Sequence, residues 1–124
     1  MKELTKAQEE ILKALWQINE GAVSDVLDAL PEPKPAYNTV ATVIKVLEKK
    51  EYVTHKTYGK THVYFPQVTK KEYAHAVIKD TAKGFFNGSL NQMVSFFVKN
   101  KSLSVNELEE LKNMIEQEIN QNKK

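Results

Sequence analysis

Four polar residues recur along one side of the segment "AYNTVATVIKVLEKKEYV", residues 36–53. At 100° per residue, Asn38, Thr42, Lys45 and Lys49 fall in one narrow band of a helix. An asparagine amide can pair with an adenine edge, a threonine can offer a hydroxyl or a methyl to a base, and a lysine can donate to guanine or to a phosphate. The band therefore carries the chemistry of nucleic-acid recognition; the alternative is a polar face that meets only water.

The opposite side of the same helix is apolar. Val40, Val43, Ile44 and Leu47 cluster there, so we expect a helix over about 37–50 that is buried on one side only. In a helix-turn-helix, such a stripe packs the second helix onto the first, and the other face enters the major groove of DNA.

Two helices are predicted before it. Thr5 and Gln8 have the spacing of a capping box, and apolar residues at helical spacing continue to about Asn19. The stretch "AVSDVLDAL" indicates a second, shorter helix with Ser24 as its expected N-cap. Three prolines within residues 31–35 end this helix, because each proline disfavours helical geometry at the residue before it.

A β-hairpin is predicted directly after the third helix. The stretch "YVTHKTYGKTHVYFPQV" has aromatic and β-branched residues on both sides of Gly59-Lys60. Three helices followed by a hairpin is the order of a winged helix, in which the hairpin is the wing. Phosphate contacts position such a domain on a duplex. The phosphate contacts expected here are Tyr37, Lys49, Lys50, Lys56 and Lys60.

Positive charge is concentrated in the middle of the chain. Residues 1–33 carry three lysines against seven acidic residues, whereas residues 34–62 carry six lysines against two. This distribution indicates a localised anion-binding face, although a solvated charged surface would have the same composition. All 18 basic residues are lysines, so the bidentate contact of arginine with guanine is excluded.

Enzymatic and metal-dependent functions find little support in the sequence. The chain has no cysteine, no glycine-rich phosphate loop and no serine elbow. His55 and His62 are expected on opposite limbs of the hairpin, where they could face each other, but we find no carboxylate partner at a suitable spacing. We therefore expect no metal, no cofactor and no catalysis. No apolar run is long enough for a transmembrane helix, and the N-terminus lacks a signal core.

The last part of the chain is predicted to be helical. Capping boxes at Thr69–Glu72 and Ser104–Glu107 mark two helix starts. The region carries more apolar side chains than a core of about 55 residues can bury, so we expect two copies to complete each other's core as a homodimer. Packing of this region on its own hairpin is the alternative. The expected dimerisation residues are Phe85, Phe86, Met93, Phe96, Phe97, Leu108, Leu111, Ile115 and Ile119.

The sequence resembles the penicillinase-repressor family of bacterial winged-helix regulators (BlaI/MecI/CopY). The resemblance is carried by "LTKAQEEILKALWQ", "YNTVATVIKVLEKKEYV", "GKTHVYFPQVTKKEY" and "FFNGSLNQMVSFFVKNKSLSVNELEELKNMI", which together span nearly the whole chain. It implies a cytoplasmic homodimer that represses transcription by binding a palindromic operator in double-stranded DNA. The base contacts that it implies in the third helix are Asn38, Thr39, Thr42 and Lys45.

The sequence departs from this family at three places. Ala41 and Val46 stand in the helix where members often carry a basic residue, so an operator sequence cannot be transferred. The bond cleaved in antibiotic-sensing members corresponds to Phe96–Phe97 instead of an Asn-Phe pair, so a membrane sensor-protease partner is implied by the resemblance alone. The cysteine-rich motif of copper-responsive members is absent.

These observations predict a mainly α fold with a small β-hairpin. A winged helix-turn-helix DNA-binding domain is expected over 1–68, followed by a helical dimerisation region over 69–124. The predicted function is sequence-specific DNA binding by a transcriptional repressor. The alternative is a winged helix that binds another protein without specific DNA binding. DNA binding would weaken steeply with salt, because counterions are released, whereas an apolar protein interface would not.

Overall fold

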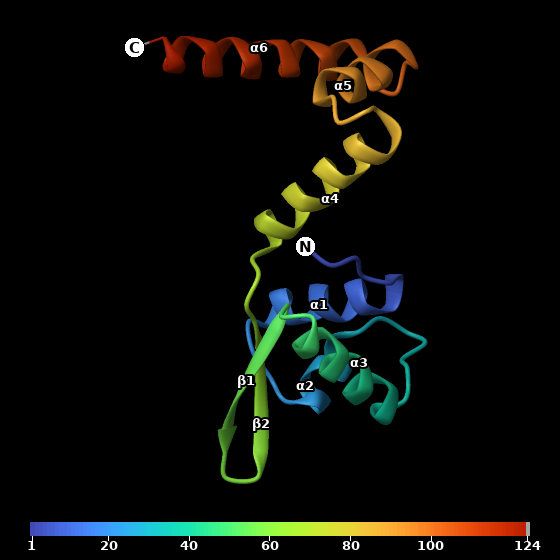
Figure 1. Cartoon of the computed structure of the whole chain (residues 1–124), viewed down its shortest axis with the longest axis vertical. Helices are drawn as coiled ribbons and strands as arrows, with labels where there is room; N and C mark the ends of the chain where they lie inside the picture. Colours follow the sequence, from blue (N-terminus) through green and yellow to red (C-terminus); the bar gives the residue numbers. More distant parts are fainter. Residues whose placement is uncertain (124) are drawn as a thin grey trace. The chain divides into compact units, whose positions relative to one another are not determined.

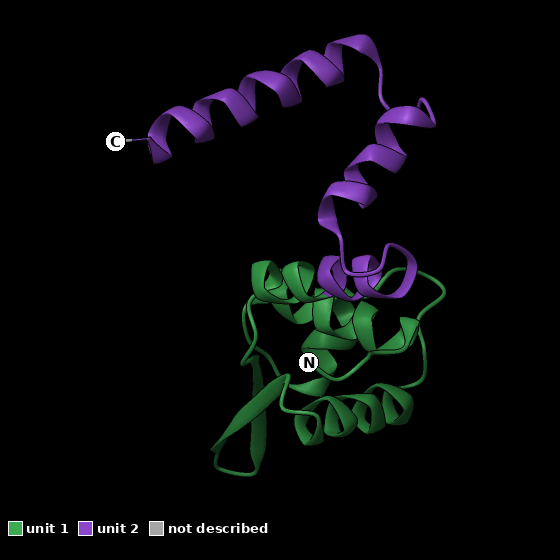
Figure 2. Ribbon diagram, turned by 45° about the horizontal axis from the view of Figure 1, so that its top comes forward, with its two compact units in different colours: residues 1–76 green, residues 77–124 purple. Residues whose placement is uncertain are grey.

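The computed structural model describes residues 1–123 and divides into two compact units, residues 1–76 and residues 77–124 (Figure 2). The predicted boundary after residue 68 refers to the division between DNA binding and dimerisation, which is a different criterion from compactness, and it stays a prediction. The elements, in chain order, are α1 (Lys6–Ile18), α2 (Val23–Ala29), α3 (Tyr37–Lys49), β1 (Val53–Tyr58), β2 (Thr61–Pro66), α4 (Lys70–Phe85), α5 (Leu90–Lys99) and α6 (Val105–Asn122) (Figure 1).

Local hydrogen bonds define three of the helix starts. At α1, the Thr5 hydroxyl accepts from the Gln8 backbone N–H at 3.2 Å, and the Gln8 amide oxygen accepts from the Thr5 N–H at 3.1 Å. The same reciprocal pair closes the Thr69–Glu72 turn before α4 and the Ser104–Glu107 turn before α6. The three predicted capping boxes are confirmed, because each depends only on residues within one turn.

The start of α2 differs from the prediction. Ser24 is not its N-cap: the helix begins at Val23, and the Ala22 backbone N–H donates to the Asp25 carboxylate at 2.9 Å. The chain just before is fixed by Gly21, whose N–H and C=O both pair with Tyr64 of β2, at 2.9 and 2.8 Å. This tertiary pairing sets the entry into α2 ahead of Ser24, and an acidic residue in the first turn suits the helix dipole.

One hydrophobic core holds the first unit together. Val40, Ile44 and Leu47 of α3 are fully buried, which confirms the predicted apolar side of this helix, and Val43 packs at its margin. Burying a side chain of this size contributes roughly 1.5–3 kcal/mol. The other buried members of the cluster are Ile11, Leu12, Ala14, Leu15, Val26, Leu30, Tyr52, Val53, Tyr64 and Tyr73.

The hairpin is antiparallel and extends from this core as a wing (Figure 1). Its register pairs Val53 with Pro66 at the root and Tyr58 with Thr61 at the tip. Gly59 turns the chain with a left-handed φ of 62°, which glycine adopts without strain. Three helices and a hairpin in this order make a winged helix-turn-helix, so the predicted fold class is confirmed.

Aromatic side chains attach the first turn of α4 to this core. The Trp16 ring N–H donates to the Val68 carbonyl at 2.8 Å, and the Tyr73 hydroxyl donates to the Glu9 carboxylate at 2.7 Å. The Tyr73 ring lies 5.8 Å, centre to centre, from both Trp16 and Tyr52. The Tyr52 hydroxyl donates in turn to the Lys2 carbonyl. The chain leaving the hairpin is therefore tied to α1.

The second unit is formed by the end of α4, by α5 and by α6. A turn at Asn87 and Gly88, with φ of 52° and 79°, separates α4 from α5, and Ser89 caps α5 by accepting from the Gln92 N–H. Among the described residues of this unit, Ala82 alone is buried. None of the helices in residues 1–123 combines the length and apolarity needed to cross a bilayer.

Replacing Tyr73 with phenylalanine tests the attachment of α4. The variant keeps the ring and loses only the hydrogen bond to Glu9, so we expect the free energy of unfolding to fall by about 1 kcal/mol at pH 7. The Tyr73 hydroxyl lowers the pKa of the Glu9 carboxyl from its ordinary 4.5. This stabilisation is therefore complete above pH 4.5 and is lost as the pH falls through the lowered value.

Urea denaturation of the wild type and Tyr73→Phe at neutral and acidic pH measures this difference. Tyr58→Phe is the matched control, because Tyr58 is exposed on the hairpin and no hydrogen bond of its hydroxyl is observed among residues 1–123. A Tyr73→Phe defect of the same size at both pH values would contradict the role given to Glu9.

Candidate nucleic-acid interface

The polar band of α3 is exposed, and its side chains have no partners among residues 1–123. Asn38, Thr42, Lys45 and Lys49 all lie on the surface, and none of these side chains makes a hydrogen bond or ion pair within the described part of the chain. Because the opposite side of α3 is buried in the core, the whole band is presented outward. Amide, hydroxyl and ammonium groups with free hydrogen-bonding capacity thus line one edge of the domain.

Thr39 lies apart from this band. It is about a quarter turn round the helix from Asn38, and it lines a cavity of about 380 Å³ together with Val43, Leu30 and Ile11. The lining is completed by Ala7, by the prolines of the α2–α3 connection and by the acidic side chains Glu10 and Glu32. The base contact that the resemblance implies for Thr39 stays a prediction, and the structure places this residue at the margin of the proposed surface.

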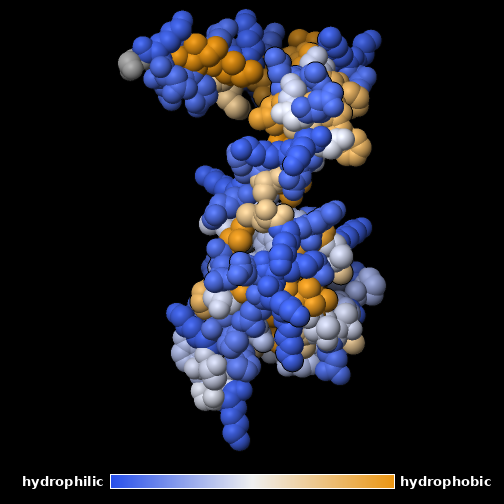
Figure 3. All heavy atoms as spheres, in the orientation of Figure 1, coloured by the Kyte–Doolittle hydropathy of each residue, from blue (hydrophilic) through white to orange (hydrophobic). Residues whose placement is uncertain are grey.

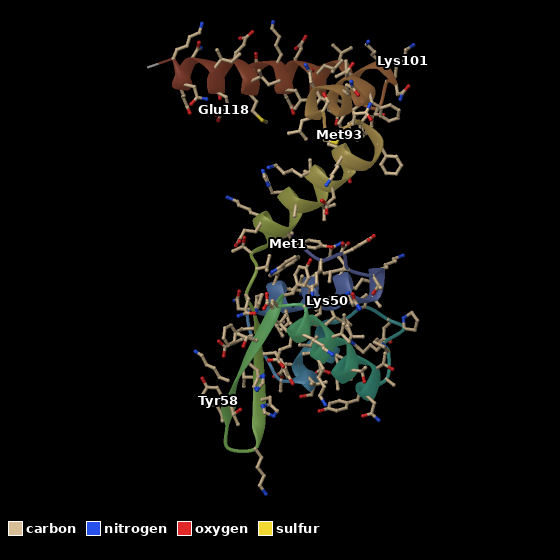
Figure 4. All side chains as sticks on the ribbon, viewed as in Figure 1. Met1, Lys50, Tyr58, Met93, Lys101 and Glu118 are labelled. Carbon is tan, nitrogen blue, oxygen red and sulfur yellow. The ribbon has the colours of Figure 1, made fainter. Side chains whose placement is uncertain are left out.

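The lysines at the hairpin and at the end of α3 differ in their surroundings. Lys60 is exposed at the turn, and the Lys56 ammonium lies 5.3 Å from the centre of the Phe65 ring, a cation–π contact that leaves it exposed. Tyr58 lies near the tip of the same hairpin (Figure 4). Tyr37, the first residue of α3, is 53 % exposed. Lys56, Lys60 and Tyr37 are thus accessible for the predicted phosphate contacts.

Two lysines of the basic segment are instead used within the protein. The Lys50 ammonium donates to the Glu3 carbonyl at 3.0 Å and to the Gln8 side chain at 2.9 Å, next to the N-terminal segment (Figure 4). The Lys34 ammonium donates to carbonyl oxygens at the end of α2, where a cation is favoured by the helix dipole. Of the lysines expected to contact phosphate, Lys50 is therefore the least free.

A carboxylate and two histidines meet where α3 adjoins the hairpin. The Glu48 carboxylate lies 2.5 Å from Nδ1 of His55, and the rings of His55 and His62 are 4.4 Å apart, centre to centre. The prediction that the histidines face each other is confirmed. The expectation that they lack a carboxylate partner is wrong, because the tight turn at Glu51, with φ of 69°, folds β1 back beside the last turn of α3.

Burial raises the pKa of the Tyr64 hydroxyl, beside the same cluster, and the nearby Glu48 carboxylate adds to this effect. Tyr64 therefore stays neutral over the physiological range. Sequence reasoning missed Glu48, and the signal that could have found it is an acidic residue in the last turn of a helix that is followed closely by a strand.

The residues predicted to mediate dimerisation form an apolar surface on the second unit. Figure 3 shows apolar atoms gathered over α5 and α6. Phe85 is 81 % exposed and Ile115 53 % exposed, and Phe96 and Phe97 are about half exposed. Val94, Val98, Leu108, Leu111 and Ile115 line an open hollow of about 330 Å³ between α5 and α6.

Three phenylalanine rings of the second unit lie close together: the centre of the Phe96 ring is 5.6 Å from that of Phe86 and 5.9 Å from that of Phe97. Of the predicted residues, Phe86, Met93, Leu108 and Leu111 are half-buried, and Ile119 is exposed. Exposed apolar area of this extent marks an interaction surface on a small domain.

The fold and the exposed polar band of α3 define a winged-helix DNA-binding protein. An exposed helix, whose polar band has no partner in the described part of the chain, lies beside a lysine-bearing wing, the arrangement by which such domains enter a major groove. The Penicillinase repressor family matches residues 4–117, and the chain belongs to this family. The predictions of a DNA-binding repressor and of a protein that is not an enzyme are confirmed by this membership.

Individual relatives match over almost their full length. The chain is 28 % identical to the penicillinase repressor of Bacillus licheniformis over 122 residues, which cover 98 % of this chain and 95 % of that protein. It is 25 % identical to the methicillin resistance regulatory protein MecI of Staphylococcus aureus (strain N315) over 114 residues, which cover 91 % and 93 %. A solved CopR repressor matches 55 % of this chain and 100 % of its own, with 25 % identity and a TM-score of 0.46.

Proposed function

We propose that this protein represses transcription in the cytoplasm by binding, as a homodimer, to a palindromic operator in double-stranded DNA. The observation that carries the proposal is the exposed band of α3, whose four side chains have no partner within the described part of the chain. In a helix-turn-helix this face enters the major groove, with its N-terminal residues nearest the bases.

The residues proposed to contact bases are Asn38, Thr42 and Lys45 of this band. Asn38 can pair with adenine through both its amide donor and its acceptor, Thr42 can contact a thymine methyl or a base edge, and Lys45 can donate to guanine. Thr39, at the margin, completes the set that the family resemblance implies. Each good bidentate contact discriminates between base pairs by about 1–3 kcal/mol.

The residues proposed to contact phosphates lie at the two ends of α3 and on the wing. Lys49 at the end of α3, Lys56 and Lys60 on the wing, and Tyr37 at the start of α3 are exposed. Such contacts orient the domain and supply affinity without reading sequence. Lys50 already donates to two oxygens of the N-terminal segment, so we assign it first to positioning that segment and only second to a phosphate.

Association of two copies is supported by the apolar surface of the second unit. A homodimer with two-fold symmetry buries the same patch of both copies against itself, and a surface centred on Phe97, Leu111 and Ile115 suits such an interface. The Phe96–Phe97 bond lies inside α5, where the backbone is hydrogen-bonded, so a protease would need that helix to open first. Regulation by cleavage at this bond therefore has no local support.

Selection of bound fragments from random duplex DNA, followed by sequencing, tests the proposed function. We expect a motif with two-fold symmetry and half-sites about one helical turn, or a multiple of it, apart. The apparent affinity should also fall steeply with salt. If a folded protein enriches no motif, the exposed face of α3 meets water or another protein, and the repressor proposal fails.

The same selection with Asn38→Ala tests the base-contacting role of Asn38. The truncated side chain loses its paired hydrogen bonds, so we expect the preference at one base pair of each half-site to relax, with a loss of about 1–3 kcal/mol on the wild-type motif. Preferences at the remaining positions should be retained. An equal loss of affinity on every sequence would refute this role.

Lys60→Ala tests the phosphate-contacting role of the wing. Loss of one ammonium should weaken binding to all duplexes alike and should reduce the slope of log affinity against log salt by about one unit for each copy that contacts DNA. Fluorescence anisotropy at several salt concentrations measures the slope. Lys13→Ala is the control, because Lys13 pairs with Glu9 on α1 at 3.4 Å, and its slope should match the wild type.

Ile115→Glu tests the apolar surface of α6. A carboxylate placed in the proposed interface would be buried without a partner, so we expect the dimer to dissociate at concentrations where the wild type stays associated. Sedimentation velocity measures the oligomeric state. Asn113→Glu adds the same charge on the opposite side of α6 and should leave the dimer intact. Equal effects of the two substitutions would contradict the assignment of this face.

A further inference from the structure

We propose that His55 and His62 form a binding site for a divalent transition-metal ion of the Zn²⁺ class on the α3-facing side of the hairpin. This site goes beyond the proposed repressor function and does not depend on it. The two residues lie on opposite strands, and alternation along each strand places them on one face with Thr57 and Tyr64. Lys56 and Tyr58 belong to the other face of the hairpin.

The hydrogen bonds observed within residues 1–123 use Nδ1 of each ring and leave both Nε2 atoms without a partner. Nδ1 of His55 faces the Glu48 carboxylate, and an ionised carboxylate can only accept, so Nδ1 carries the proton and Nε2 of the neutral ring keeps its lone pair. Nδ1 of His62 lies 3.2 Å from the Thr57 hydroxyl, which can accept in the same way. A histidine that donates one N–H to a carboxylate or hydroxyl while offering the other nitrogen is the usual metal-ligating arrangement.

The spacing of the rings suits one shared ion. Two imidazoles that bind the same ion at about 2.0–2.1 Å place their ring centres roughly 4.5 Å apart when the angle at the metal is 90°, and roughly 5.2 Å apart at the tetrahedral angle. The observed separation is 4.4 Å, with an angle of 77° between the ring planes. To bind one ion, the two rings must separate slightly and turn about their side-chain torsions until both Nε2 atoms point to it.

The site has an open side. His62 is exposed and the His55 side chain is 31 % exposed, so water can occupy the remaining positions of the metal. The described residues contain no group of three or more histidine, cysteine, aspartate or glutamate side chains arranged to hold an ion. The protein therefore supplies two ligands, with Glu48 acting through His55 as a positioning residue. Imidazole donors suit Zn²⁺, Cu²⁺ and Ni²⁺ rather than Mg²⁺ or Ca²⁺.

Titration of the whole protein with Zn²⁺, followed by calorimetry and by ¹⁵N NMR of the histidine rings, tests the site. We expect one saturable site per chain, with Nε2 of both His55 and His62 shifting while both Nδ1 atoms stay protonated. His55→Ala and His62→Ala should each abolish saturable binding. Glu48→Gln should weaken it by 10- to 100-fold, the typical effect of losing a hydrogen bond to a ligating histidine.

His75→Ala is the matched control, because it removes the remaining histidine, which is exposed on α4, and it should bind like the wild type. Circular dichroism of each variant confirms folding. Zn²⁺ should also raise the melting temperature of the wild type and of His75→Ala, but not of His62→Ala, since a ligand that binds only the folded state stabilises it. Saturable binding that persists without both hairpin histidines, or wild-type ring resonances that do not move, would overturn the proposal.

Discussion

Burial of one side of α3 is the constraint on which the rest of the structure depends. Val40, Ile44 and Leu47 are completely removed from solvent, and together their burial contributes several kcal/mol. A helix whose apolar stripe is fixed in this way cannot rotate, so Asn38, Thr42 and Lys45 must face outward. The same constraint places Glu48 at the edge that adjoins the hairpin. The candidate DNA surface and the histidine cluster are thus consequences of core packing.

Hydrogen bonds within the protein select which charges remain for a partner. The segment 34–62 contains six lysines. The Lys34 ammonium, however, donates to carbonyl oxygens at the end of α2, and the Lys50 ammonium donates to the N-terminal segment and to Gln8. Within residues 1–123, the lysines of this segment whose ammonium groups make no hydrogen bond are Lys45 and Lys49 on α3 and the two wing lysines. The proposed anion-binding face is therefore smaller than the sequence indicates, and it comprises one edge of α3 and the wing.

Sequence reasoning succeeded where structure is local and failed where it is tertiary. The capping box at Thr5, the period of α3 and the turn at Gly59 depend on a few neighbouring residues, and each was predicted correctly. Ser24 failed as a cap because pairing of Gly21 with Tyr64, residues distant in sequence, sets the start of α2. The Glu48–His55 pair was missed for a related reason, since it forms only once β1 folds back on α3. Which exposed residues contact bases depends on how a DNA duplex lies against the protein. The sequence of one chain does not contain that geometry.

Because the chain has no arginine, its sequence specificity is expected to depend on dimerisation. A lysine ammonium is a point charge without the planar fork that reads guanine, so each recognition helix has few groups able to discriminate between bases. One winged helix would then gain most of its affinity from phosphates and little specificity. Two helices held together read twice as many base pairs, and the costs of mismatches, about 1–3 kcal/mol each, add for separated positions. In the proposed dimer, the apolar surface of α5 and α6 therefore supplies specificity that α3 alone does not have.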